Sequence, residues 1–141
     1  MNLQELLKKH EGLRLKLYQD SLGIPTIGYG FNLRDNSITQ EIAQELLDLV
    51  LSPIISQLSS YPWFTQLNEA RQAAIVDMAY NMGISNLLQF HHMLQALQEG
   101  NYQEAASQML NSLWAKQVGI RAQEDAELIR TGQSGPDSDS A

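Results

Sequence analysis

The stretch HEGLRLKLYQDSLGIPTIGYGFN, residues 10–32, decides the fold of this chain. Apolar and polar residues alternate from Leu13 to Tyr18, which predicts a half-buried strand. The segments DSLG and GYG that follow are typical of turns, so residues 13–33 predict a small antiparallel hairpin or meander. The buried side of the first strand would carry Leu13, Leu15 and Leu17.

A short helix is predicted on the N-terminal side of this stretch. Its apolar residues recur at helical spacing, and they follow Asn2, a residue type favoured at helix N-caps. The predicted helix covers residues 3–11, with Glu11 in its last turn just before Gly12 ends it. The apolar residues of the pattern are Leu3, Leu6 and Leu7.

The rest of the chain is helical in character. Ser37 and Gln40 resemble a capping box ahead of a helix over about residues 38–58, which Pro53 should kink or restart. SSYPWF reads as a loop, and Asn68 should cap a helix that Gly83 ends. Further helices are predicted over residues 86–98, 101–110 and 119–130, and a disordered tail over residues 133–141.

Composition restricts the class of protein. The chain has 141 residues with 43% hydrophobic content, which suits one domain with a core of its own, and it contains no cysteine for disulfides or thiol chemistry. Because a small sheet is followed by helices, the predicted fold class is α+β. Its net charge of −7 argues against a nucleic-acid partner. No run is apolar enough for membrane insertion and the N-terminus lacks a secretory pattern, so we expect synthesis in the cytoplasm. The default expectation for the oligomeric state is a monomer.

Two carboxylates flank the predicted strand. Glu11 precedes it at the end of a helix and Asp20 follows it in a turn, an arrangement that can bring both to one cleft. Most single surface carboxylates are merely solvated. A pair in different environments can divide the work of glycosidic bond cleavage, one as acid and the other as base or charge stabiliser.

Other candidate sites are weaker. Gly28 and Gly30 do not form a phosphate-binding loop, because Phe31 and Asn32 stand where such a loop needs lysine and a hydroxyl residue. We expect these glycines to allow a tight turn or a close approach of the backbone. The adjacent His91 and His92 would point about 100° apart on a helix, so no metal site is predicted, and no cofactor is expected. Six further residues suit packing in the core or at a lobe junction, namely Trp63, Phe64, Met78, Met82, Met93 and Met109. The alternative for the aromatic residues is that one of them lines a sugar site.

At this point four segments together resemble the phage-type lysozymes of glycoside hydrolase family twenty-four. They are HEGLRLKLYQD…TIGYG, RQAAIVDMAYNMG, LQFHHMLQALQEGNYQEAA and WAKQVGIRAQEDAELIRTG, and they occur in the family's order. The resemblance implies one lysozyme-like domain over residues 1–132. Its parts would be a small β lobe at about 13–36, an interlobe helix at about 38–58, and a helical lobe at about 64–131. The N-terminal helix 3–11 would also belong to the helical lobe.

The resemblance also implies a muramidase acting on the glycan strand of peptidoglycan. Carried over by position, Glu11 is the general acid, Asp20 orients and activates a water, and Thr26 helps hold that water on the opposite face of the sugar. Cleavage would then invert the anomeric configuration. Arg121 matches the family arginine that pairs with the catalytic glutamate. Substrate contacts fall at Asn32, Tyr80, Met93 and Gln108.

Three features depart from the family's best-known member. Phe31 replaces a histidine next to the site, the segment after Leu33 is shorter, and the chain is acidic where that member is basic. These features leave open a catalytically silent module that binds peptidoglycan or a protein. The biological role is also open. The chain could be a phage or prophage endolysin that acts once the inner membrane is opened, or it could be an effector or bacteriocin domain.

Overall fold

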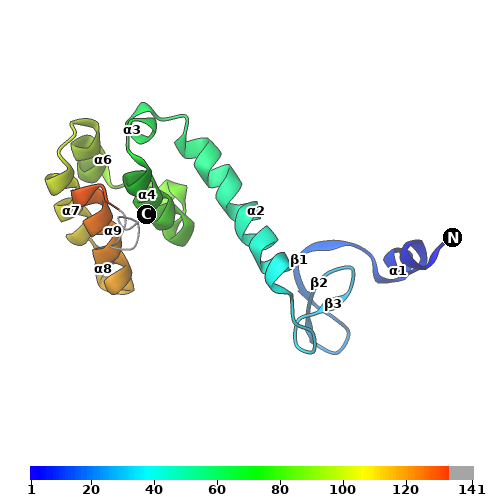
Figure 1. The fold of residues 1–141 in the computed structure, drawn as a ribbon. Coiled ribbons are helices and arrows are strands. Elements are labelled where there is room, and N and C mark those ends of the chain that lie inside the picture. The colour runs from blue at the N-terminus through cyan, green and yellow to red at the C-terminus, as the bar shows by residue number, and fades with distance from the viewer. Residues whose placement is uncertain (134–141) are drawn as a thin grey trace. The chain divides into compact units, whose positions relative to one another are not determined.

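The computed structural model describes residues 1–133 and is mainly helical, with one small antiparallel sheet near the N-terminus (Figure 1). This confirms the predicted α+β class. The elements are α1 (Leu3–Glu11), β1 (Arg14–Gln19), β2 (Pro25–Gly28), β3 (Phe31–Asn32), α2 (Gln40–Leu58), α3 (Pro62–Thr65), α4 (Glu69–Met82), α5 (Ile84–Leu87), α6 (His91–Gln98), α7 (Tyr102–Leu110), α8 (Leu113–Val118) and α9 (Ile120–Thr131).

The chain divides into two compact units, and the division falls inside α2. The first unit, Met1–Glu45, holds α1 and the sheet, and the second begins at Leu46 and holds α3 to α9. Each unit is described by itself below.

Helix α1 has the predicted bounds, and its ends show why. The Asn2 side chain accepts a hydrogen bond from the Glu5 amide, and the Glu5 side chain accepts one from the Asn2 amide, which completes a capping box. Gly12 ends the helix with a positive φ of 73°, and its amide donates to the Lys8 carbonyl. None of the residues of α1 is buried.

The sheet has the strand order β1-β2-β3, with antiparallel neighbours. Arg14 pairs with Gly28 and Tyr18 with Thr26, so the register shifts between these pairs. Ile24 and Thr26 are the buried residues of this region. The predicted burial of the leucine side of β1 is wrong, because no helix of the first unit makes extensive contact with β1, and Leu13, Leu15 and Leu17 are exposed.

Helix α2 begins later than the sequence suggested. Thr39, rather than Ser37, is its N-cap, because the Thr39 hydroxyl accepts from the Ile42 amide at 3.2 Å. The predicted capping box at Ser37 is therefore wrong. The helix continues through Pro53 to Leu58, and no second helix begins at the proline.

The second unit is a helical bundle in which α9 contacts α4, α7 and α8 (Figure 1). Its core confirms the predicted packing roles of Trp63, Phe64 and most of the methionines. The largest side chains that are fully buried are Leu58, Ile75, Met78, Leu87, Met93, Met109 and Ile129.

Several boundaries in this unit differ from the predictions. The helix predicted over 86–98 is two helices, α5 and α6, separated by a turn at 88–90. Helices α3 and α8 were not predicted, because each is too short to show a periodic pattern. Within residues 1–133, no helix has the length and apolar character that a membrane span requires. The predicted tail lies almost entirely outside the described residues.

Candidate active site

The first unit positions Glu11 through contacts between α1 and the β2–β3 turn. Lys8 and Glu11 are three residues apart and therefore share one face of α1. The Lys8 ammonium lies 5.3 Å from the centre of the Tyr29 ring, a cation–π contact, and the Glu11 side chain lies against Gly30. The Glu11 carboxylate is exposed. The last turn of α1 is thus held on the hairpin while its carboxylate remains accessible.

The contact with Glu11 explains why position 30, in the GYG segment, is a glycine. A Cβ atom built there would lie 2.8 Å from Cδ of Glu11, so only glycine leaves room for this carboxyl group. Gly28 has the same φ of +72° but nothing within 4 Å of an added Cβ. The close backbone approach expected from the sequence is therefore made at Gly30, to a side chain of the same chain, while Gly28 serves the turn.

Asp20 and Thr26 meet at the backbone of Ile24. The Asp20 amide and the Thr26 hydroxyl both donate to the Ile24 carbonyl, at 3.0 and 2.8 Å. Oδ1 of Asp20 in turn accepts from the amides of Leu22 and Ile24, at 2.8 and 2.9 Å. These bonds fix both side chains to one turn after β1.

This network limits what each group can do with a water molecule. The Thr26 proton is committed to a carbonyl, so the hydroxyl is left to accept a hydrogen bond from a water. Oδ1 of Asp20 holds two amides, so Oδ2 is the oxygen suited to take a proton. A water donating to both would have its lone pair available for attack. Thr26 is only 3% exposed, so such a water would be well shielded from bulk solvent.

Asn32 and Phe31 lie on β3 beside this network. Asn32 is the cross-strand partner of Thr26, so the two side chains share one face of the sheet. The Asn32 side chain already makes hydrogen bonds within the chain. Its Oδ1 accepts from the backbone amides of Arg34 and Asp35, and its Nδ2 donates to the Asp35 carboxylate. Phe31 pairs with Ile27 and is half-buried. Any contact of Asn32 with a substrate would have to share these bonds.

The remaining predicted site residues belong to the second unit. Tyr80 and Arg121 line a pocket of about 550 Å³ between α2 and α4, together with Asp77. The Arg121 guanidinium makes a two-pronged ion pair with Asp77, with Nε 2.9 Å from Oδ2 and Nη2 2.7 Å from Oδ1. Its pairing with Glu11 remains a prediction.

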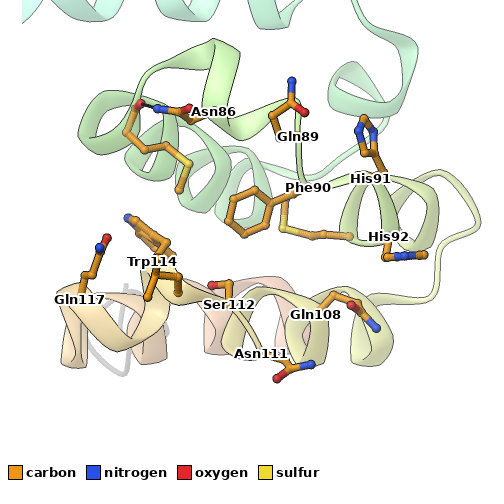
Figure 2. Close-up of a pocket in the computed structure, with 13 residues that line it drawn as sticks. Asn86, Gln89, Phe90, His91, His92, Gln108, Asn111, Ser112, Trp114 and Gln117 are labelled. Atoms are coloured by element: carbon orange, nitrogen blue, oxygen red, sulfur yellow. Dashed lines mark hydrogen bonds between the residues drawn. The ribbon is translucent and has the colours of Figure 1, made fainter.

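Met93 and Gln108 line a second pocket, of about 560 Å³. Figure 2 shows side chains from α5 and α6 on one side and from α7 and α8 on the other, with the Phe90 ring projecting between them. The Trp114 indole lies in its wall and donates to Asn81 at 2.8 Å. Most of the polar groups in its wall are neutral amides, namely Asn86, Gln89, Gln108, Asn111 and Gln117. His91 and His92 are exposed at this pocket. Residues 1–133 contain no cluster of side chains suited to a metal ion.

The family model of phage lysozymes matches residues 8–130, nearly the whole of the described chain. The chain belongs to the phage lysozyme family. It is therefore a lysozyme-type glycoside hydrolase, of the kind that hydrolyses peptidoglycan.

Known relatives of this family member come from different settings. It is similar to the pre-baseplate central spike protein Gp5 of Enterobacteria phage T4, with 32% identity over 94% of this chain but only 28% of the relative. It is also similar to the endolysin of Salmonella phage P22, with 38% identity over 78% of each chain. A probable T4-type lysozyme of Dictyostelium discoideum is 28% identical over 93% of this chain and 95% of its own.

Sequence reasoning missed two carboxylates of this lysozyme-type hydrolase. Asp77 interrupts the apolar run of α4, a signal that could have been used, because a charge within such a helix needs a partner. Hydrogen bonds from Arg121 hold the pKa of Asp77 below its ordinary value. Asp125 is buried on α9, and burial, followed by the neighbouring Asp77, raises its pKa to about 8. Its place between Glu124 and Ala126 gave no such signal.

Proposed function

We propose that this hydrolase is a muramidase, which cleaves the β-1,4 bond from N-acetylmuramic acid to N-acetylglucosamine by an inverting mechanism. Glu11 donates a proton to the leaving oxygen. Asp20 accepts a proton from a water that Thr26 helps to hold, and this water attacks the opposite face of the sugar. Inverting cleavage needs room for the water, and carboxyl groups about 6.5–9.5 Å apart generally provide it.

The observation that carries this proposal is the network that joins Asp20, Ile24 and Thr26. It leaves one acceptor on each of the two side chains that are assigned to the water. The exposed Glu11, held beside Gly30, supplies the other half of the chemistry, since an acid must reach the leaving group without displacing the fold.

A glycan strand carries hydroxyl and amide groups, which form hydrogen bonds with neutral polar side chains. We assign Asn32, Tyr80 and Gln108 to substrate contact, and Met93, which is only 1% exposed, to the packed wall beneath the pocket. The amide-rich pocket around Gln108 supports the assignment of Gln108. Amide side chains both donate and accept hydrogen bonds, and aromatic rings such as Phe90 and Trp114 offer apolar faces to a sugar or a peptide. Arg121 would pair with Glu11 and hold its carboxyl group in place.

The biological setting is proposed as lysis of a bacterial host by a phage or prophage. The similarity to the endolysin of Salmonella phage P22 supports it. In this setting the enzyme reaches the cell wall only after the inner membrane is opened. Expression in a Gram-negative cell should then cause lysis when the membrane is permeabilised and little lysis otherwise.

Digestion of isolated peptidoglycan tests the proposed reaction. The wild type should release muropeptides that end in reducing N-acetylmuramic acid, and Glu11→Gln should be slower by about 100-fold or more, the usual contribution of a general acid. Mass analysis of the products separates the outcomes. Wild-type activity no higher than that of Glu11→Gln rejects the enzyme. Binding of glycan without product would favour the silent binding module, and products lighter by one water would indicate non-hydrolytic cleavage.

A further inference from the structure

The group formed by Asp77, Arg121 and Asp125 is built more elaborately than a simple ion pair. Arg121 and Asp125 are four residues apart on α9, so they lie on the same face of that helix and meet Asp77 on α4. The guanidinium binds both oxygens of Asp77. After burial, hydrogen bonding with Asp77 is the next cause that raises the pKa of Asp125.

Asp125 is an unusual component of this group because it is almost completely enclosed. It is 4% exposed, and among the described residues its Oδ2 atom has no hydrogen-bond partner. An ionised carboxylate would be costly there, beside a second carboxylate that is already charged. A hydrogen bond between two carboxyl groups requires a proton on one of them, and the Arg121 ion pair keeps Asp77 ionised. The proton therefore belongs to Asp125.

We propose that Asp77 and Asp125 are positioning residues for Arg121, with the Asp125 proton locking Asp77 in the orientation that aims the guanidinium into the pocket it shares with Tyr80. This inference rests on the proposed function, in which Arg121 acts on the catalytic acid. Asp77 binds the guanidinium along its Nε–Nη2 edge, and the protonated Asp125 donates a hydrogen bond to the Asp77 carboxylate.

Such a lock depends on pH. The charged groups that act on Asp125 are Asp77 from α4 and Arg121 and Glu124 from α9 itself. The other helices that pack on α9 contribute apolar side chains to the core, among them Ala105, Ala106, Met109 and Trp114. Because the pKa of Asp125 is about 8, its proton leaves above that pH. Two negative charges then compete for one guanidinium, and the orientation of Arg121 is released.

Two substitutions of Asp125 test the lock in the full-length protein. Asp125→Asn keeps a donor toward Asp77 but cannot ionise, and Asp125→Leu removes the donor. Relative to pH 6.5, wild-type kcat on peptidoglycan should fall several-fold by pH 9, and this alkaline fall should be absent in Asp125→Asn. Asp125→Leu should show a kcat about tenfold lower throughout, comparable to the loss of one hydrogen bond to a charged group, with KM little changed. Glu127→Gln removes an exposed carboxylate of the same helix that is not among the groups acting on Asp125, so it is the matched control and should keep the wild-type profile.

The carboxyl carbon of Asp125 gives a readout that does not depend on activity. Its NMR titration in the wild type should show a midpoint near pH 8, and the Arg121 Nε–H signal should shift in the same range. Titration of Asp125 below pH 5, or an alkaline fall that persists in Asp125→Asn, overturns the lock. Absence of hydrolysis at every pH, together with the expected titrations, would instead reject the proposed function.

Discussion

Replacing Gly30 with alanine tests how the hairpin positions the proposed acid. Gly28 and Gly30 both have a φ of +72°, so alanine at either position must adopt an unfavourable positive φ. They differ in surroundings. A Cβ at Gly30 would lie 2.8 Å from Cδ and 3.2 Å from Cγ of Glu11, whereas a Cβ at Gly28 meets nothing within 4 Å. Gly28→Ala is therefore a matched control for Gly30→Ala.

The size of the effect follows from these contacts. Left-handed backbone costs a non-glycine residue about 1–2 kcal/mol, so both variants should lose roughly this much stability. Carbon atoms pack about 3.5–4.0 Å apart, so the Glu11 carboxyl group must move by about 1 Å to accommodate the new methyl group. The move costs little stability because Glu11 is exposed. A displacement of about 1 Å in a reacting group costs on the order of 100-fold in rate.

Rates of peptidoglycan hydrolysis and thermal unfolding of the two variants separate these effects. Gly30→Ala should be about 100-fold slower than Gly28→Ala, while their Tm values agree within a few degrees. Equal rates in the two variants would refute the claim that Gly30 positions Glu11. A much lower Tm for Gly30→Ala would show that the contact supports the fold more than the site.

Three further predictions concern single side chains. Asp125 takes up a proton on folding, because its pKa is about 8 in the native state and about 3.8 when unperturbed, so stability falls as pH rises from about 4 to about 8. In urea unfolding measured at several pH values, Asp125→Asn should remove this fall of the unfolding free energy with pH and stabilise the protein at pH 7 by at most about 4 kcal/mol. An unchanged pH dependence of the unfolding free energy would contradict the raised pKa of Asp125. Thr26→Val should lower kcat by about 100-fold or more, yet cost only about 1 kcal/mol for its hydrogen bond, and a fully active variant would exclude the water-holding role. Arg71→Ala removes a hydrogen bond to the Ile129 carbonyl at 2.7 Å and a cation–π contact with Tyr102 at 3.5 Å. It should lower the free energy of unfolding by about 2 kcal/mol and leave the activity of the folded protein unchanged, which calorimetry and turbidity assays would check.

Local sequence signals predicted elements whose ends are set by local chemistry. The bounds of helix α1 were predicted correctly because Asn2 and Gly12 form the hydrogen bonds at its two ends without help from other elements. Prediction failed where partners are distant in sequence or a pattern is short. Alternation in β1 does not reveal whether a helix covers its leucine side, and α8 contains only six residues. The cap of α2 was missed because Ser37 and Thr39 are equally suitable by residue type.

The candidate site shows the same division. Glu11, Asp20 and Thr26 could be selected from one stretch of sequence, and the structure adds the Ile24 carbonyl that links Asp20 with Thr26. Asp77 and Asp125 are 48 positions apart in the sequence, on α4 and α9, so no rule of short sequence spacing could reveal their interaction. A titratable group enclosed in a helical core becomes visible only when its neighbours are known.

The anomeric configuration of the first product tests the proposed mechanism most directly. Proton NMR of a soluble peptidoglycan fragment during digestion would follow the newly formed reducing end before it equilibrates. Attack by a water held by Asp20 and Thr26 predicts the α-anomer first, with the β-anomer appearing only by mutarotation. Initial formation of the β-anomer would show retention, and would contradict the roles assigned to these two residues.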